Sequence, residues 1–498
     1  MVPLGDELST APATGRNGRP NILMLFSDEH HWQYSGYAGH PVVQTPNLDR
    51  LAASGVNFTD AYCNSPLCSP SRQSFMAGLY CHRIGMWNNV CSMPENTVTW
   101  AHALHAAGYE TLLCGKMHFN GYQKMYGFNR RPVLEGGNSG AVFHSWGYRT
   151  SHSWLDPLPY RADPGYPGNR DIDEAGADTP ERRPIFRHDT RIADGTLAVL
   201  REKAADPAGK PWALCCGMVL PHPPFTARPD LMERYRGKGD LPFNLEGASL
   251  GVCDRYIRQY SNLDRTTCAP DRARILREAY FGLITEYDEY VGRIMDCLRE
   301  TGLAGNTVVF YFSDHGEMAC EHGMIGKVPL RESSVRVPLL VSWPGRFAAG
   351  RTVNTPVSLV DLYPTFLDIA RYRLPAQLPL DGNSLMPLIE GRPAEFKGCG
   401  VFGEFEGEGW NHPRAFVREG DFKFVYSHTA PAELYHVRDD YFEMSNLVGM
   451  PAYAAVEARL RARLLDGWDP AAIEIEVIRT QERQKLAPCR NVCGDLGW

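Results

Sequence analysis

NILMLFSD, residues 21–28, is an unbroken apolar run that ends in an acid. Helices cover both sides of a parallel sheet, so its strands are apolar on both faces, and this run has that composition. A second run of the same kind, TVVFYFSD, occupies residues 307–314 and also ends in an aspartate. The two runs predict buried strands of an α/β fold.

Strand-like and helix-like patterns alternate outward from these runs. Apolar runs predict further strands at residues 109–116, 212–220 and 337–343. Periodic apolar patterns predict helices within residues 45–55, 97–108, 191–203, 277–300 and 358–370. This alternation predicts a largely parallel sheet that is covered by helices on both faces.

The pattern changes after Leu374, where the chain becomes rich in proline and glycine. Short strand-like pieces follow and predict a small antiparallel sheet, with an amphipathic helix packed on it at residues 454–468. We therefore divide the chain into a polar leader, an α/β domain, a C-terminal subdomain and a tail, at residues 1–19, 20–374, 375–472 and 473–498. The tail has no clear partner within the predicted fold, so we expect it at a subunit interface of a homo-oligomer.

Composition and charge exclude several classes of protein. The chain has 498 residues and a net charge of −7, which gives no reason to expect a nucleic-acid partner. No apolar run is long enough to span a bilayer, and the first twenty residues lack the apolar core of a signal peptide. We therefore expect a cytoplasmic protein without a membrane partner. Its 14 cysteines are scattered, as reduced and mostly buried thiols would be.

Polar side chains follow several of the predicted strands, at the edge of the sheet where α/β proteins bind ligands. They are Asp28 and Glu29, Lys116 and His118, His222, Asp314 and His315, and then His322 and Lys327. Taken singly, an aspartate is usually a helix cap and a lysine is usually solvated. Taken together, the acids with an imidazole suit a divalent cation, and the lysines and histidines suit an oxyanion. This combination is typical of enzymes that transfer phosphate or sulfate.

NSPLCSPSRQSFMAGLY, residues 64–80, places a cysteine just ahead of a predicted helix. Phosphatases with a cysteine nucleophile separate cysteine and arginine by five residues, whereas three separate Cys68 from Arg72. A serine hydrolase would have Gly-x-Ser-x-Gly, which neither serine of this stretch has. A buried cysteine before a helix that Ser69 caps, with Pro70 in the first turn, explains the helix start but not Arg72.

CSPSR at residues 68–72, with MAG at 76–78, resembles the Cys-x-Pro-Ser-Arg signature of the type I sulfatases, in the alkaline phosphatase superfamily. NILMLFSDE resembles the family's first metal-binding strand, GYETLLCGKMHF its Gly-Lys-x-His motif, and FYFSDHGEMACEHGMIGK its second metal motif and lysine. RVPLLVSWPG, VDLYPTFLDIA and ELYHVRDDYFEMSNL continue the match over most of the chain. The resemblance implies a large mixed sheet sandwiched by helices and a sulfuric ester hydrolase of the choline-sulfatase-like or arylsulfatase-like branch.

The resemblance also implies that Cys68 is oxidised to formylglycine (3-oxoalanine) by a formylglycine-generating enzyme during maturation. The aldehyde hydrates to a gem-diol, of which one oxygen attacks sulfur while the other drives expulsion of sulfate. Arg72 would hold this diol. The site would lie at a helix N-terminus, which favours anions.

Further roles follow from the same resemblance. Lys116 and Lys327 would bind sulfate oxygens, and His118 would take the proton that drives collapse of the diol. His222 or Lys327 would protonate the leaving oxygen, and Asp314 would be the base for the attacking hydroxyl. The substrate would be a small sulfate ester.

The resemblance implies one divalent cation, bound by Asp28, Cys68, Asp314 and His315. Glu29 stands where the family often has aspartate, so its ligation is left open. His315 stands where many relatives carry asparagine, and an imidazole is compatible with manganese as well as calcium. We therefore expect Ca²⁺, with Mn²⁺ and Mg²⁺ as alternatives.

Other functions remain open from the sequence. Phosphonate monoester hydrolases and phosphodiesterases share the formylglycine and the metal motifs, but Lys116 and His118 favour sulfate. A non-catalytic protein on the same scaffold is a second alternative. EFEGEGW, residues 404–410, is either a solvated acidic loop or a cradle for a cationic group such as that of choline sulfate. Aryl and sugar sulfates are equally open.

Overall fold

The computed structural model describes residues 18–135, 175–177, 184–247, 249–260, 263, 268–407, 410 and 412–486. Residues 1–17 of the predicted leader and residues 487–498 of the predicted tail lie outside this range. Among the helices that are described, none is both long and apolar enough to cross a membrane.

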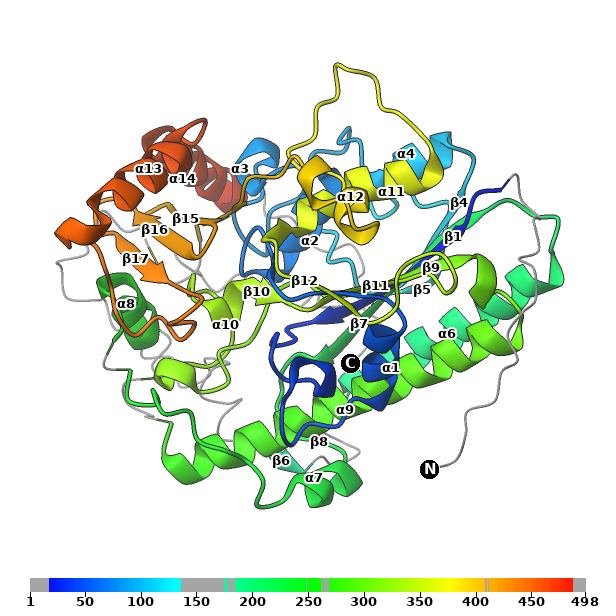
Figure 1. Cartoon of the computed structure of the whole chain (residues 1–498), viewed down its shortest axis with the longest axis horizontal. Coiled ribbons are helices and arrows are strands. Elements are labelled where there is room, and N and C mark those ends of the chain that lie inside the picture. Colours follow the sequence, from blue (N-terminus) through cyan, green and yellow to red (C-terminus); the bar gives the residue numbers. More distant parts are fainter. Residues whose placement is uncertain are drawn as a thin grey trace.

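An eight-stranded sheet forms the centre of the fold, in the order β12-β2-β11-β9-β1-β7-β4-β5 (Figure 1). Its strands are β1 (Asn21–Asp28), β2 (Val56–Phe58), β4 (Glu110–Gly115), β5 (Arg130–Leu134), β7 (Trp212–Pro221), β9 (Thr307–Ser313), β11 (Leu339–Ser342) and β12 (Arg351–Val353). Strands β9, β1, β7, β4 and β5 run parallel, whereas β11 is antiparallel to both β9 and β2. The sheet is therefore mixed, which confirms the predicted fold class.

Helices cover both faces of this sheet (Figure 1). On one side lie α1 (Pro46–Ala53), α6 (Pro184–Ala205), α7 (Pro229–Tyr235) and α9 (Pro270–Glu300). On the other side lie α2 (Cys68–Ala77), α4 (Trp100–Ala106) and α11 (Leu362–Ala370). All residues of β1 and β9 are consequently buried, which explains why both strands are apolar on both faces.

The predicted strand at residues 337–343 is two strands in the structure. Val337 ends β10 (Arg336–Val337), and β11 begins at Leu339, so Pro338 separates them. Proline has no backbone N–H to donate to a ladder, which accounts for the break. Strand β10 pairs with β3 (Ala61–Tyr62), which in turn pairs with β13 (Val357–Ser358). This small sheet holds the chain just ahead of α2.

The C-terminal part contains the predicted small antiparallel sheet and helix. The strands are β14 (Val401–Phe405), β15 (Arg414–Glu419), β16 (Phe422–Ser427) and β17 (Glu433–His436), and α13 (Ala454–Leu465) packs on β15 and β16. Buried Lys423 of β16 joins this sheet to the α/β domain, because its Nζ lies 3.0 Å from Glu332 Oε1.

The tail begins with a helix, α14 (Pro470–Leu486), which packs on its own chain. Ile473 and Val477 are buried in the hydrophobic core. Glu474 lies 2.6 Å from His412 Nδ1. The expectation that the tail has no partner within the fold is therefore wrong for this helix, whereas its place at a subunit interface stays a prediction.

Short elements complete the description. Other α-helices in the described part of the chain are α3 (Cys81–Ile84), α8 (Val252–Tyr260), α10 (Glu332–Val335) and α12 (Met386–Ile389). Strands β6 (Gly176–Ala177) and β8 (Thr226–Ala227) form a two-stranded sheet.

Candidate active site

Strands β1 and β9 bring the predicted acids together. Strands β1 and β9 are parallel neighbours in register, with Ser27 opposite Ser313, so Asp28 and Asp314 emerge side by side. The backbone N–H of Glu29 donates to Asp314 Oδ1 at 3.1 Å, which ties the two strand ends together. Both aspartates are fully buried.

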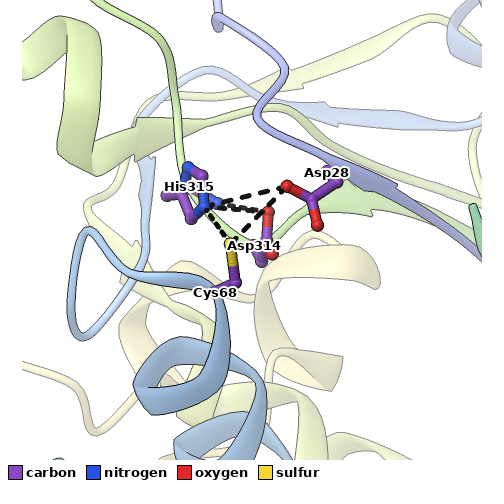
Figure 2. A group of neighbouring side chains, drawn as sticks. All are labelled: Asp28, Cys68, Asp314 and His315. Carbon is purple, nitrogen blue, oxygen red and sulfur yellow. Dashed lines mark hydrogen bonds and ion pairs between the residues drawn. The ribbon is translucent and has the colours of Figure 1, made fainter. Parts of the chain in front are cut away.

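Cys68 is the first residue of α2 and points at this pair (Figure 2). Its Sγ lies 3.2 Å from His315 Nε2 and 3.8 Å from Asp28 Oδ1. The helix begins two residues earlier than a Ser69 cap would give, with Leu67 as the residue before it and no side-chain cap. Ser69 does not act as the cap, because its hydroxyl donates to the His118 carbonyl at 3.3 Å.

Arg72 lies one turn further along α2 and is fully buried between the two aspartates. Its guanidinium donates to Asp314 Oδ2 at 2.7 Å, to Asp28 Oδ2 at 2.9 Å and to the Lys116 carbonyl at 3.1 Å. The resemblance placed this side chain on residue 68 itself. The structure shows it fixing the two carboxylates that face that residue, and its contact with the diol stays a prediction.

The charges around Cys68 favour its ionised form. Burial opposes ionisation of the thiol, but Lys116, Lys327 and His315 hold the pKa of Cys68 well below its usual range. Burial and Cys68 likewise oppose ionisation of Asp28, yet Lys116, His222 and Arg72 hold the pKa of Asp28 below its usual range. The centre therefore concentrates negative charge within a frame of basic groups.

The donor set of this centre fits a divalent cation. One ligand atom from each of Asp28, Cys68, Asp314 and His315 lies within 4.8 Å of the others, and all four residues are buried. His315 Nδ1 donates to the Gly316 carbonyl at 3.0 Å, so the lone pair of Nε2 faces Cys68 and the carboxylates. Two carboxylates and an imidazole are ligands for calcium, manganese or magnesium.

Lys116 and His118 reach the same centre from β4. Gly115 has a φ of +91°, and a Cβ there would lie 2.3 Å from the Gly217 carbonyl oxygen, so this turn requires glycine. It directs Lys116 Nζ to within 2.5 Å of Asp28 Oδ2. The imidazole of His118 lies close enough to the Cys68 side chain to help lower the pKa of its thiol.

Glu29, His222 and Lys327 form a second group beside the first. Lys327 Nζ lies 2.5 Å from Glu29 Oε2 and 2.8 Å from His222 Nε2. His222 Nδ1 donates to the Pro223 carbonyl at 2.7 Å, so its Nε2 accepts from the lysine ammonium. Burial raises the pKa of Glu29 to about 8, against the effect of Lys327. The structure thus places Glu29 beside the four-residue cluster, where its carboxylate lies within 4.8 Å of ligand atoms of Asp28 and His222.

Two other predictions from the sequence lie away from this centre. His322 is buried and bonds Ser249 and the Phe442 carbonyl, which is a structural environment. Glu404 and Glu406 are buried, so the reading of residues 404–410 as a solvated loop is wrong for them. The Glu404 carboxylate accepts from His82 and from Trp468 Nε1.

Sequence reasoning missed several residues that support the site. Asn89 Oδ1 accepts the Ser69 N–H at 2.9 Å, next to Cys68. Glu135 Oε2 accepts the N–H groups of Met117 and His118 at 3.0 and 2.6 Å. Glu135 directly follows β5. A search for polar residues at the ends of predicted strands would have found it if β5 had been predicted.

The chain matches two models of known protein families. Residues 20–372 match the family model described as "Sulfatase", and residues 320–468 match "N-sulphoglucosamine sulphohydrolase, C-terminal".

Curated relatives match over most of their length. The chain is 31% identical to a choline-sulfatase of Rhizobium meliloti over 490 residues, covering 94% of this chain and 90% of the relative. It is 30% identical to an arylsulfatase K of Danio rerio over 451 residues, covering 86% and 80%.

Solved structures share the fold. A phosphonate monoester hydrolase of Agrobacterium radiobacter superposes with a TM-score of 0.69 at 24% identity, covering 90% of this chain and 95% of that one. A structure in complex with its substrate D-glucosamine-2-N,6-O-disulfate superposes with the same TM-score at 22% identity, covering 95% and 100%.

Proposed function

The chain belongs to the sulfatase family and is a sulfuric ester hydrolase, and from this premise we propose that it hydrolyses a sulfate monoester through a formylglycine at residue 68 and a divalent cation. The products would be an alcohol and inorganic sulfate. The observation that carries the proposal is the position of Cys68, buried at the start of α2 against Asp28 and His315.

In this proposal Asp28, Asp314, His315 and residue 68 hold the cation, for which calcium is our first choice and manganese or magnesium the alternatives. The cation supplies positive charge that offsets the charge of the sulfate oxygens. Arg72 keeps Asp28 and Asp314 aligned toward residue 68, because it donates to one oxygen of each carboxylate.

The aldehyde hydrate at residue 68 supplies one hydroxyl that attacks sulfur and a second whose proton is lost as sulfate departs. His118 lies close enough to the Cys68 side chain to help lower the pKa of its thiol, and we assign its imidazole to take this second proton. Lys116 lies on the Asp28 side of residue 68 and Lys327 on the Glu29 side, where their ammonium groups are available to sulfate oxygens.

Protonation of the leaving oxygen is assigned to the Lys327–His222 pair. Lys327 Nζ carries protons and donates one hydrogen bond to His222 Nε2 at 2.8 Å. The His222 side chain is 25% exposed, so a proton can be replaced from solvent after each turnover. The reacting alcohol oxygen would receive its proton from this pair as the S–O bond breaks.

Phosphonate monoester or phosphodiester hydrolysis is the second candidate. The superposition with the phosphonate monoester hydrolase shows the shared fold. The family model and the sulfatase relatives support sulfate over phosphonate. We expect the rate with an aryl sulfate to exceed the rate with the corresponding aryl phosphonate.

The identity of the alcohol in the sulfate ester is a separate proposal. The choline-sulfatase relative supports choline sulfate as the first ester to test. Arylsulfatase K supports aryl and sugar sulfates as the next. Release of inorganic sulfate from a panel of these esters identifies the class.

Mass spectrometry tests the chemistry at residue 68. We expect the peptide that contains residue 68 to carry formylglycine when the protein is made together with a formylglycine-generating enzyme. Cys68→Ala should fold and lose turnover of every ester. A fully active preparation with an unmodified thiol, or an active Cys68→Ala variant, would refute the proposal.

A further inference from the structure

Glu317 begins the segment that ends at Lys327, and it fixes that segment at both ends. The side chain is fully buried. Its Oε1 accepts the backbone N–H of Ala319 at 2.8 Å and that of Gly326 at 2.7 Å. The Met318 N–H also donates to the Gly326 carbonyl at 2.8 Å, so the segment from 317 to 327 is a closed loop.

The backbone of this loop needs such support. Ala319, Cys320 and His322 have φ values of 45°, 70° and 53°, in the left-handed region. Each such residue costs on the order of 1–2 kcal/mol when it is not glycine, so the surrounding contacts must hold it in place. One carboxylate oxygen that binds both arms of the loop provides such a contact.

Glu317 also reaches Lys327 by a second route. Its carboxyl group is a near neighbour of that of Glu29, and the two repel each other when both are charged. Glu29 Oε2 binds the Lys327 ammonium and lies 3.3 Å from His222 Nε2. The position of the Lys327–His222 pair therefore depends on Glu317 through the backbone at Gly326 and through the Glu29 carboxyl group.

We propose that Glu317 is a positioning residue for the Lys327–His222 pair and sets how well this pair protonates the leaving oxygen. The inference rests on the proposed function, because it takes the reaction to be cleavage of a sulfate ester. It assigns Glu317 no contact with the substrate.

Sulfate esters with different leaving groups distinguish this positioning role from a general role of Glu317 in folding. When the S–O bond breaks, the bonding electrons go to the alcohol oxygen. A nitrophenolate is stable with that charge and departs without a proton, whereas an alkoxide needs one as the bond breaks. A defect in proton donation must therefore slow alkyl sulfates far more than 4-nitrophenyl sulfate. A general loss of folded enzyme slows both equally.

The experiment compares kcat/KM for 4-nitrophenyl sulfate and for an alkyl sulfate in three variants. Glu317→Ala removes both backbone contacts, and we expect a loss of about 100-fold with the alkyl ester but less than about 10-fold with the aryl ester, in line with the usual worth of a general acid. Glu317→Asp cannot span both N–H groups and should shift the ratio in the same direction. Glu317→Gln keeps an oxygen for both N–H groups and a side chain of the same size beside Glu29, so it should restore the ratio to within about threefold.

Glu278 of α9 offers a matched control. Its Oε1 also accepts two backbone N–H groups of one segment, those of Gly237 and Gly239, at 2.8 and 3.3 Å. These glycines belong to a segment that contributes no residue to the candidate site. Glu278→Ala should lower the melting temperature without changing the ratio between the two esters.

The outcomes separate this inference from the proposed function. A wild-type protein that carries formylglycine and hydrolyses no sulfate ester overturns the proposed function. An active wild type whose ratio is unchanged in both Glu317→Ala and Glu317→Asp overturns this inference alone. If Glu317→Ala does not fold, the ratio in Glu317→Asp decides.

Discussion

Arg72 shows how one side chain determines the electrostatics of the centre. A buried cation and two buried carboxylates are tolerated only because they pair with good geometry, since each charge loses its hydration. Arg72 satisfies this condition with hydrogen bonds to Asp28 and Asp314 and with its guanidinium 4.2 Å from the centre of the Phe26 ring. The arginine of the CSPSR motif therefore has a role in the folded enzyme in addition to its place in the signature.

Replacing Arg72 should destabilise the fold as well as stop turnover. Arg72→Met takes the guanidinium from buried Asp314 and leaves buried Asp28 with Lys116 alone, and breaking a buried pair in this way typically costs about 3–5 kcal/mol. We expect a clear fall in melting temperature by circular dichroism. Arg72→Lys keeps the charge, so its melting temperature should fall less. A melting temperature equal to that of the wild type in Arg72→Met would contradict this assignment.

A cation should stabilise the protein through the same centre. Binding to the folded state alone contributes about 2.7 kcal/mol at a hundredfold excess over Kd. We expect calcium or manganese added to chelator-treated protein to raise the melting temperature. Asp314→Asn should abolish this rise in melting temperature. Asp271→Asn changes an exposed acid of α9 and should preserve the rise.

The search for polar residues at strand ends predicted residues that lie in the candidate metal centre. It missed residues that hold the surrounding backbone in place. Asp28, Asp314 and Lys116 follow strands with apolar signatures, so their meeting could be expected. Glu317 and Asn89 act on backbone N–H groups of segments that only the folded chain brings to them. No spacing in the sequence indicates such contacts.

At the scale of the elements, β5 illustrates why some strands escape detection. Its residues, RRPVL, alternate between exposed and partly buried, as expected for an edge strand with a proline. The buried strands β1, β7 and β9 were predicted because apolar residues continue along both of their faces. Burial on both faces makes a strand recognisable, and edge strands lack it.

The junction between α3 and β14 should respond to pH. Both the backbone N–H and Nδ1 of His82 bond the buried Glu404 carboxylate. Burial opposes protonation, but Glu404 raises the pKa of His82 above its ordinary value of 6.5. The pair therefore stabilises the fold in full below that ordinary pKa, and the contribution is lost as pH rises through the folded-state pKa.

This pH dependence can be measured by thermal unfolding. The melting temperature of the wild type should exceed that of His82→Gln by more at about pH 6 than at about pH 9. The same comparison in a Glu404→Gln background should show no such change. An equal difference at both pH values would mean that the pair does not contribute through its charge.

At the scale of the whole molecule, α14 attaches the tail to the core through one face and leaves the other face exposed. Ile473 is 7% exposed and Ile475 is 50% exposed on the same helix. Truncating a buried isoleucine typically costs about 2–5 kcal/mol, whereas a surface change stays within about 0.5 kcal/mol. Ile473→Ala should therefore lower the melting temperature and Ile475→Ala should not.

Light scattering on the same two variants tests the predicted subunit interface. Dissociation of an oligomer by Ile475→Ala, with its melting temperature unchanged, would support an intersubunit role for the exposed face of α14. A monomeric wild type would refute the expected homo-oligomer.

The overall architecture was the most predictable level. Alternating apolar and amphipathic segments specify a sheet between helices, and the turn-rich pieces after residue 400 specify the small sheet. The attachment of α14 could not be predicted, because its contacts with His412 and the core are distant in sequence.

The pairing of β1 with β9 also sets the order in which the protein can be finished. Residue 68 leaves the ribosome roughly 250 residues ahead of Asp314, which at 5–20 residues per second corresponds to about 12–50 s of translation. During that interval the central sheet has no β9, so Asp314 and His315 are not yet beside Cys68. In the finished protein Cys68 is only 2% exposed. An enzyme that converts this cysteine would therefore have to act before translation and folding are complete.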